Sequence, residues 1–266
     1  MNDPESQFNK SKLIDPFGRQ IEYVRLSVTD KCNLRCFYCM PKGFNNFEPP
    51  ANWLTFDEIE RLMATFGQLG VSRIRLTGGE PLVRKNLAEL TARLSRLPGI
   101  NDLSLSTNAT LLEQQAEDLY KAGIRRINVS LDTLDDERFL NITGNGKLPC
   151  VLRGLTKARE VGFEPIKINM VVMKETSLDD YEHVLEYCME NNFTLRFIET
   201  MPLGTPGRDA SAQYLSLNSV KQRLDKKYNL VPGLMMGGGP ARYYRINGTQ
   251  YKIGFITPIS QHFCET

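Results

Sequence analysis

The stretch YVRLSVTDKCNLRCFYC, residues 23–39, joins two patterns that together decide the fold. Its first half alternates aliphatic with polar side chains, as a β-strand with two different faces does. Its second half places Cys32, Cys36 and Cys39 directly after that strand. Tetrahedral structural metal sites use four ligands, so three cysteines raise the question of what fills the fourth position.

Five further stretches share the β-like alternation, and helical patterns lie between them. The expected strands are residues 23–28, 73–76, 102–107, 126–131, 166–172 and 194–199. The expected helices lie near residues 55–69, 86–97, 111–122, 151–161, 178–191 and 219–228. Thr55 and Glu58 have capping-box spacing at the start of the first helix. Gly70, Gly123 and Gly162 fall where helices would end in a left-handed cap.

Six successive βα units favour a parallel sheet, because each crossover helix returns the chain in the same direction. Six units are too few for the usual closed barrel of eight. The expected fold is therefore α/β, an incomplete (βα)6 barrel of the TIM type with an open side. Residues 1–20 would form an N-terminal arm, residues 21–230 the barrel, and residues 231–266 the start of a C-terminal region. A triple glycine at 237–239 would be a linker loop that a further strand follows.

One face of the expected sheet carries an excess of cations. The crossover helices must cover the aliphatic face, which leaves Arg25, Arg75, Lys167 and Arg196 on the other. An ordinary barrel fills its interior with branched aliphatic side chains, and burying unpaired cations is costly. The pattern favours an open lumen that binds a polyphosphate or a carboxylate. The alternative is a half-exposed sheet with solvated charges.

Composition excludes several classes of protein. The chain has 33 Lys and Arg against 31 Asp and Glu, a net charge of +2, which is not typical of a nucleic-acid-binding protein. The N-terminus has no secretory signal pattern, and no apolar run approaches the roughly 18 residues of a membrane span. A cytoplasmic protein without nucleic-acid or membrane partners is expected. In a reducing compartment Cys150 and Cys188, on helical patterns, are expected to be buried thiols.

The cysteine spacing C-x3-C-x2-C differs from the paired hooks of structural zinc, and no histidine lies nearby. Thiolates in a tight loop suit an iron–sulfur cluster, and three of them on four irons leave one iron open for a small molecule. CNLRCFYC, with Tyr38 before the third cysteine, resembles the signature of the radical S-adenosylmethionine (SAM) superfamily. The resemblance implies a [4Fe-4S] cluster on Cys32, Cys36 and Cys39, with SAM chelating the fourth iron. Incidental cysteines or a zinc loop are the alternatives.

Later motifs narrow the resemblance. TGGEP (77–81) resembles the glycine-rich stretch by which the same superfamily holds the amino group of SAM; its glycines would let the backbone approach the ligand, and Glu80 could meet the ammonium. LIDPFGRQIEYVRLSVTDKCNLRCFYCMP, RIRLTGGEPLVRKNL, RRINVSLDTL, IKINMVVMK, RFIETMPLG and IGFITPISQHFCET together resemble the GTP 3′,8-cyclase family of molybdenum-cofactor biosynthesis. That family converts GTP to (8S)-3′,8-cyclo-7,8-dihydroguanosine 5′-triphosphate. By position, the GTP contacts would be Arg25, Arg75, Ser106 and Lys167. The SAM contacts would be Tyr38, Gly78, Gly79, Glu80, Ser130 and Met201. Taken alone, Ser130 could be a helix cap and Met201 a packing residue.

The resemblance also implies partners: a reductant protein and the next enzyme of the pathway, cyclic pyranopterin monophosphate synthase, with the chain itself a monomer or homodimer. Two departures from the family pattern accompany it. Ala109 stands where the family often has glycine. Of the three cysteines that hold a second family cluster, only Cys264 has a match, so a truncated form with impaired cyclisation is expected. The rival functions are a radical enzyme acting on a peptide, an inactive cluster-binding variant and a zinc-binding regulatory module.

Overall fold

The computed structural model describes residues 12–41, 43–174, 176, 178–201, 213–233 and 240–258. The strands are β1 (Tyr23–Ser27), β2 (Arg73–Thr77), β3 (Asp102–Thr107), β4 (Ile124–Ser130), β5 (Ile166–Val172), β6 (Thr194–Glu199), β7 (Leu230–Gly233), β8 (Arg242–Ile246) and β9 (Lys252–Ile256). The helices are α1 (Phe56–Gln68), α2 (Leu87–Leu94), α3 (Leu112–Lys121), α4 (Asp136–Thr143), α5 (Leu148–Val161), α6 (Leu178–Glu190) and α8 (Leu217–Tyr228). Short 3₁₀ turns cover Pro50–Asn52 and Pro81–Val83.

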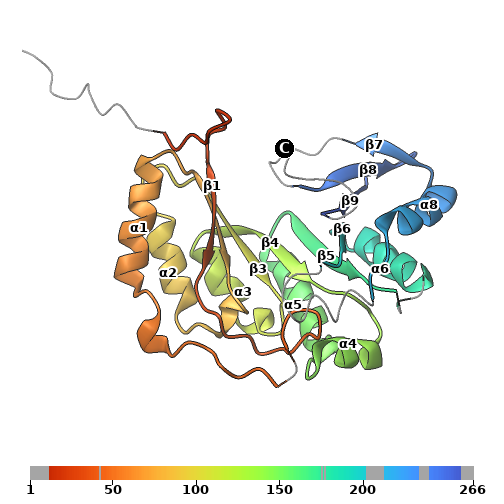
Figure 1. Cartoon of the computed structure of the whole chain (residues 1–266), viewed down its shortest axis with the longest axis horizontal. Helices are drawn as coiled ribbons and strands as arrows, with labels where there is room; N and C mark the ends of the chain where they lie inside the picture. The colour runs from red at the N-terminus through yellow and green to blue at the C-terminus, as the bar shows by residue number, and fades with distance from the viewer. Residues whose placement is uncertain are drawn as a thin grey trace, which may run out of the picture.

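All of these strands belong to one sheet, in the order β1-β2-β3-β4-β5-β6-β9-β8-β7. The first six pair in parallel and in chain order, which confirms the predicted α/β partial barrel. Crossover helices lie around the outside of the curved sheet (Figure 1). The sheet is longer than six strands, because β9 adds in parallel to β6 and the antiparallel strands β8 and β7 follow it. The division of the chain near residue 231 stays a prediction.

Alternation along the strands explains why the sheet has one dry face. Ile74 and Leu76 on β2 and Ile168 and Met170 on β5 are fully buried, whereas their neighbours along each strand are partly exposed. The buried set packs under the crossover helices in a single core. Burial of such aliphatic side chains supplies about 1.5–3 kcal/mol each. The helices therefore have to cover this face, and the opposite face is left for another purpose.

Helix ends follow the local signals in the sequence. Thr55 and Glu58 form the predicted capping box at the start of α1. The three predicted cap glycines all have left-handed φ angles: 97° at Gly70, 119° at Gly123 and 99° at Gly162. The predicted strand after the triple glycine is confirmed as β8, whereas residues 237–239 themselves lie outside the described residues.

Helix α4 was not expected from the sequence. Its eight residues, DERFLNIT, start after the N-cap Asp135, whose side chain accepts a hydrogen bond from the Arg138 amide. Phe139 and Ile142 are buried one turn apart, which is too short an apolar pattern to distinguish a helix from a loop. Helix α5 likewise begins at Leu148, three residues before the predicted start, because Pro149 occupies its first turn.

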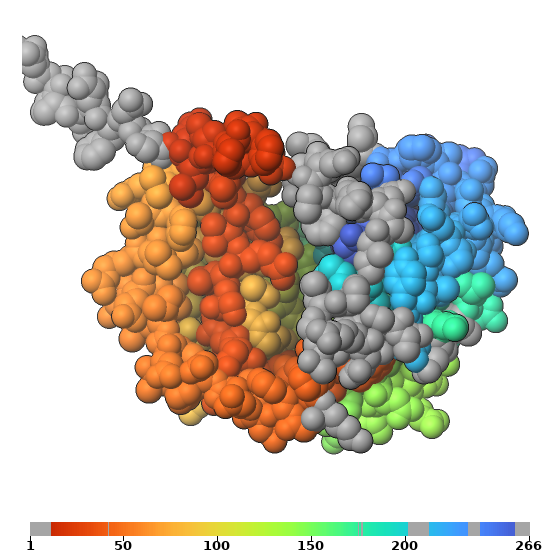
Figure 2. Space-filling view, viewed as in Figure 1, coloured from red at the N-terminus to blue at the C-terminus, as the bar shows by residue number. Residues whose placement is uncertain are grey.

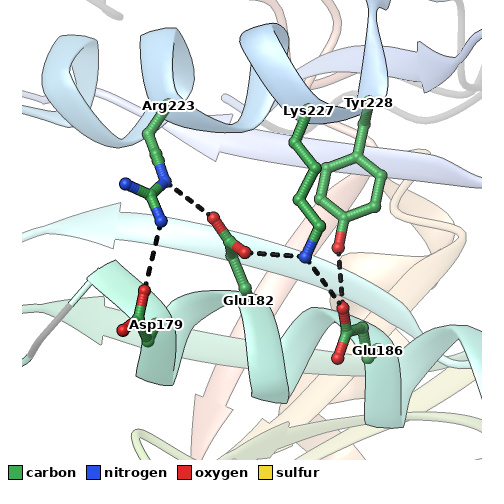
Figure 3. A network of polar contacts seen from close by, with 6 residues as sticks. All are labelled: Asp179, Glu182, Glu186, Arg223, Lys227 and Tyr228. Carbon is green, nitrogen blue, oxygen red and sulfur yellow. Dashed lines mark hydrogen bonds and ion pairs between the residues drawn. The ribbon is translucent and has the colours of Figure 1, made fainter.

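A polar network joins α6 to α8 on the outside of the barrel (Figure 3). Glu182 accepts hydrogen bonds from Arg223 Nε at 2.9 Å and from Lys227 Nζ at 2.7 Å. Lys227 Nζ also lies 3.1 Å from Glu186. The Glu182 side chain is only 9% exposed, whereas its two cationic partners are half exposed. Salt bridges with Lys227 and Arg223 lower the pKa of Glu182 below its ordinary value.

Replacing Glu182 with glutamine is expected to lower the free energy of unfolding by about 1–2 kcal/mol, because the buried carboxylate is the centre of the network. A group with a lowered pKa stabilises the fold above its ordinary value of 4.5, and that stabilisation is lost as the pH falls through the folded-state pKa. The free energies of unfolding in urea of the parent and of Glu182→Gln should therefore differ at pH 7 and become equal in acid. The matched control is Glu186→Gln, whose carboxylate is 47% exposed and should contribute under about 1 kcal/mol. Equal losses in both variants would contradict the assignment of Glu182 as the centre.

The two helical cysteines differ. Cys188 on α6 is fully buried, as predicted, and burial raises the pKa of its thiol. The prediction for Cys150 is wrong, because this residue on α5 is only half-buried and its sulfur lies 3.5 Å from Arg153 Nη2. Within the described part of the chain, none of the helices has the length and apolar character needed to cross a lipid bilayer.

Candidate functional site

The cysteine loop leaves the carboxyl end of β1 and lies against the last turn of α4. The amide of Arg35 donates to Thr143 O at 2.8 Å, and the amide of Phe37 donates to Ile142 O at 3.2 Å. These carbonyls belong to the end of a helix, where the helix itself provides no hydrogen-bond donor. Asn145 Nδ2 donates to Asn33 O at 2.9 Å and extends the contact by one residue. Helix α4, which the sequence did not reveal, therefore supports the loop that carries Cys32, Cys36 and Cys39.

The three cysteines of the loop could supply the thiolate ligands of an iron–sulfur cluster. All three are free, and the described residues contain no group of three donors spaced to hold one metal ion. In a four-iron cluster each thiolate binds a different iron, so the sulfurs lie further apart than the ligands of one zinc. Burial raises the pKa of the Cys32 and Cys36 thiols, and for Cys36 the Asp132 carboxylate adds to the effect. Iron would therefore displace protons when it binds.

Gly78 and Gly79 follow β2 and lie directly against the backbone of the cysteine loop. A Cβ atom at Gly78, whose φ is 152°, would lie 2.2 Å from Thr29 O. A Cβ atom at Gly79 would lie 2.4 Å from Asp30 O and 2.5 Å from Lys31 O. The amide of Gly79 donates to Thr29 O at 2.9 Å. The sequence suggested that these glycines let the backbone approach a ligand; what the structure demonstrates is their close approach to the cysteine loop.

Glu80 is buried within the protein rather than exposed to a ligand. Its side chain is 1% exposed and accepts hydrogen bonds from Thr107 Oγ1 at 2.7 Å, from the amide of Asn108 at 2.6 Å and from the amide of Leu82 at 3.1 Å. Burial raises the pKa of this carboxyl to about 7. Glu80 therefore ties the loop after β2 to the loop after β3, and its predicted contact with a SAM ammonium stays a prediction.

Tyr38 is anchored by a carboxylate that sequence analysis missed. Its hydroxyl donates to Asp132 Oδ2 at 2.5 Å, and the amide of Val171 donates to Asp132 Oδ1 at 2.7 Å. Asp132 is 5% exposed, and burial raises its pKa to about 6. It follows β4 within the quoted stretch RRINVSLDTL, so its position at the carboxyl edge of the sheet was the available signal. The pair joins the cysteine loop to β4 and β5.

The remaining predicted SAM residues lie at strand ends with free surface. Ser130 ends β4 in an exposed position and does not cap α4, whose N-cap is Asp135. Met201 is 42% exposed just after β6, so it does not belong to the core.

Ala109, where the family often has a glycine, has a left-handed φ of 59° and is fully buried. The chain thus keeps the glycine conformation there with a residue that rarely adopts it.

The strand register sets two of the four predicted lumen cations side by side and places polar residues next to the other two. Arg25 on β1 is the direct partner of Arg75 on β2. Lys167 on β5 pairs with Asn128 on β4, and Arg196 on β6 pairs with Asn169 on β5. Ser106 on β3 is the register partner of Asn128 and is partly buried. Figure 2 shows a hollow between the red strand β1 and the blue C-terminal part of the chain.

Few counter-charges accompany these cations. No carboxylate of the described residues forms a salt bridge with Arg25, Arg75, Lys167 or Arg196, although Arg126 on the same face pairs with Asp102. Burial, and then the neighbouring arginines, lower the pKa of Lys167 to about 8. Three buried side-chain atoms on this face have no hydrogen-bond partner among the residues that the structure describes: Tyr23 Oη, Asn169 Oδ1 and Arg196 Nε. Buried polar atoms normally have partners, so the face is suited to an anionic, polar ligand.

Several residues of this region have no distinguishing signal in the sequence. Arg126 and Asn128 lie on the lumen face of β4, where alternation alone identified them as polar without indicating a role. Asn108 and Asn33 hydrogen-bond across two loops at 2.9 Å, and no sequence pattern reports such a contact.

Comparison with known proteins supports the same picture. The family profile "Radical SAM superfamily" matches residues 26–188, and "Molybdenum Cofactor Synthesis C" matches residues 193–266. A protein of Paracoccus denitrificans named GTP 3′,8-cyclase is 44% identical over 96% of this chain and 74% of its own length. A protein of Pseudomonas aeruginosa named GTP 3′,8-cyclase 2 is 44% identical over 96% of this chain and 77% of its own. The chain spans about three quarters of these relatives.

Solved structures share the fold at low sequence identity. Streptococcus suis SuiB, in a crystal structure with bound S-adenosylmethionine, has a TM-score of 0.61 at 20% identity, covering 79% of this chain and 45% of SuiB. Escherichia coli coproporphyrinogen III oxidase (HemN), a radical SAM enzyme, has a TM-score of 0.55 at 14% identity, covering 88% of this chain and 62% of HemN. From the cysteine loop, the profiles and the 44% identical relatives, the chain belongs to the radical SAM superfamily and, within it, to the GTP 3′,8-cyclase family.

Proposed function

We propose that this chain binds a [4Fe-4S] cluster and S-adenosylmethionine and converts GTP to (8S)-3′,8-cyclo-7,8-dihydroguanosine 5′-triphosphate, the reaction for which its relatives are named. The observation that carries the proposal is the coexistence of two features in one barrel. A loop of three free thiols lies at the carboxyl edge of the sheet, and the lumen face carries cations that form no salt bridge with a carboxylate in the described part of the chain.

The cysteine loop would hold the cluster through Cys32, Cys36 and Cys39, which leaves one iron for the amino and carboxylate groups of SAM. When bound, the cluster supplies the electron that cleaves SAM and thereby the radical that removes a hydrogen atom from the substrate. The chain's own contribution is to position and shield the reactants. Six residues that follow β1, β2, β4 and β6 are proposed to contact SAM: Tyr38, Gly78, Gly79, Glu80, Ser130 and Met201.

The lumen face would bind the triphosphate. Arg25 and Arg75 lie on adjacent strands in register, and Lys167 lies further across the sheet. Guanidinium groups suit phosphate oxygens because they donate two parallel hydrogen bonds, and an ammonium acts as a point charge. Ser106 would donate a hydroxyl from β3. Burial, and then repulsion by the neighbouring arginines, lower the pKa of Lys167, and a bound anion would offset that repulsion.

Three finer points belong to the same proposal. Cys264, proposed as a ligand of a second cluster, lies outside the described residues. A reductant protein is proposed as the electron source. The product would pass to cyclic pyranopterin monophosphate synthase.

Anaerobic reconstitution tests the proposal. Protein loaded with iron and sulfide is mixed with SAM, dithionite and GTP, and the products are separated by chromatography. We expect 5′-deoxyadenosine and a cyclised guanine nucleotide in parallel amounts. Cleavage of SAM that depends on an added peptide, and not on GTP, would favour a peptide-modifying enzyme instead. Protein that binds zinc and takes up no iron would overturn the proposal altogether.

A further inference from the structure

The side chain of Asn108, in the loop after β3, approaches the first thiol of the cysteine loop. Asn108 Nδ2 lies 3.9 Å from Cys32 Sγ, within hydrogen-bonding range for sulfur. The backbone amide of Leu34 is a second donor to the same sulfur, at 3.4 Å. Cys32 therefore has two N–H groups directed at it, one from its own loop and one from a different strand connection.

Hydrogen bonds to both the backbone and the side chain of Asn108 fix its orientation. Its amide N–H donates to the buried Glu80 carboxylate at 2.6 Å. Its Oδ1 accepts from the amide of Thr110 at 3.1 Å and from Thr110 Oγ1 at 2.7 Å, which fixes Nδ2 as the group facing the cysteine loop. Its Nδ2 also donates to Asn33 Oδ1 at 2.9 Å, and Asn33 Nδ2 donates to Thr110 Oγ1 at 2.8 Å. The donor is therefore preorganised before any cluster binds.

A donor at a cluster thiolate changes the chemistry of the cluster. Each added electron makes the cluster more negative, so an N–H group directed at a coordinating sulfur stabilises the reduced state more than the oxidised state. Hydrogen bonds to the sulfurs are among the main determinants of iron–sulfur reduction potentials. Asn108 also donates its backbone N–H to Glu80, which directly follows Gly79. Asn108 therefore links Cys32 to the loop after β2 that is proposed to contact SAM.

We propose that Asn108 is a positioning residue that raises the reduction potential of the cluster by donating to the Cys32 thiolate. The inference rests on the proposed function, because it needs the cluster that the family implies. It concerns a residue that is neither one of the three proposed iron ligands nor one of the proposed GTP contacts.

The test is a redox titration of the reconstituted protein with dithionite and mediator dyes, followed by electron paramagnetic resonance. Asn108→Ala removes the donor. Asn108→Asp keeps the shape and the acceptor for Thr110 but replaces the donor with a negative charge. Asn145→Ala is the matched control, because it removes an anchor of the same loop, Asn145 Nδ2 to Asn33 O, without touching the sulfur.

We expect the midpoint potential to fall in the order parent, Asn108→Ala, Asn108→Asp, with Asn145→Ala equal to the parent. For Asn108→Ala we expect about a tenfold lower ratio of reduced to oxidised cluster at a fixed potential, which is about 60 mV for one electron. In the parent exchanged into D2O, pulsed spectra should show an exchangeable deuteron coupled to the cluster that is weaker in Asn108→Ala.

Equal potentials in all four proteins would overturn the inference and leave the proposed function intact. Loss of iron from both Asn108 variants, with Asn145→Ala fully loaded, would support a direct role at Cys32, whereas equal loss from all three variants would overturn it. Failure of the parent itself to take up iron would overturn the proposed function instead, so the two failures are distinguishable.

Discussion

Alanine at Gly78 is expected to reduce iron incorporation to below about a tenth of the parent level and to destabilise the fold by about 2–4 kcal/mol. The added Cβ would lie 2.2 Å from Thr29 O and 3.2 Å from Thr29 N, both of them backbone atoms that cannot rotate away. The φ of 152° adds strain, because side-chain-bearing residues rarely adopt it. Relief requires the loop after β2 to separate from the loop that leads into Cys32.

Separation would break a short ladder between the two loops. Val28 N donates to Thr77 O at 3.0 Å, Gly79 N to Thr29 O at 2.9 Å and Glu80 N to Lys31 O at 2.8 Å. The ladder ends one residue before Cys32, so the position of the first ligand depends on it. Iron and sulfide per chain after reconstitution, together with thermal unfolding of the apoprotein, measure the effect.

Gly248→Ala is the matched control for this prediction. Gly248 also has a left-handed φ, 75°, but a Cβ atom there would meet no atom within 4 Å. The Gly248→Ala variant should lower the free energy of unfolding by about 1 kcal/mol through backbone strain alone and leave iron incorporation at the parent level. If Gly78→Ala loaded as much iron as Gly248→Ala, the close approach of the two loops would not matter for the cluster.

Replacing Lys167 with methionine is expected to weaken GTP binding by roughly 30- to 160-fold, or about 2–3 kcal/mol. Methionine keeps the length and apolar stem of lysine and removes only the charge. The Lys167 side chain is partly buried on the lumen face, so water can replace the lost ammonium only in part. Equilibrium binding to the reconstituted protein, without reductant, measures the affinity separately from turnover, and SAM binding should stay unchanged.

The pH dependence of the parent gives a second readout. In the protein without GTP, Lys167 has a pKa of about 8, and a bound triphosphate favours its charged form. Below pH 8 the ammonium is already present and affinity should be flat. Above pH 8 binding must be coupled to proton uptake, so affinity should fall by up to about tenfold per pH unit. The Lys167→Met variant should lack this slope.

Lys121→Met is the control for charge. Lys121 lies at the end of α3 with a side chain that is 73% exposed, so its loss lowers the net charge equally but far from the lumen face. Its effect on GTP affinity should be under about twofold once salt screens the surface. Equal weakening by both variants would show that the affinity reflects the overall charge and not the arrangement of cations on the sheet.

The strands and the lumen face could be predicted because alternation is a direct consequence of the sheet. Leu76 and Ile168 have to face the helices, and this fixes Arg75 and Lys167 on the opposite side without further information. The position of the cysteine loop follows equally, since it begins where β1 ends. These features depend on neighbours along the chain, which a sequence displays.

Contacts between loops could not be predicted in this way. The role of Glu80 depends on Thr107 and Asn108 from another strand connection, and the contact of Asn108 with Cys32 joins residues 76 positions apart. Helix α4 was missed because its buried face is short, and only its packing against Arg35 and Phe37 reveals its purpose. Such contacts depend on the register of the finished sheet.

The parallel pairing of β9 with β6 determines at which edge of the sheet β9 ends. Strand β8 reverses the direction and β9 reverses it again, so β9 runs parallel to β6. After two reversals β9 has the same direction as β7 and β6. Ile256, the last residue of β9, therefore lies at the same rim of the sheet as the end of β1, where the cysteine loop begins. A single hairpin in place of β7, β8 and β9 would have delivered it to the opposite rim. The meander of β7, β8 and β9 therefore places the last described residues, Thr257 and Pro258, at the rim that carries the cysteine loop.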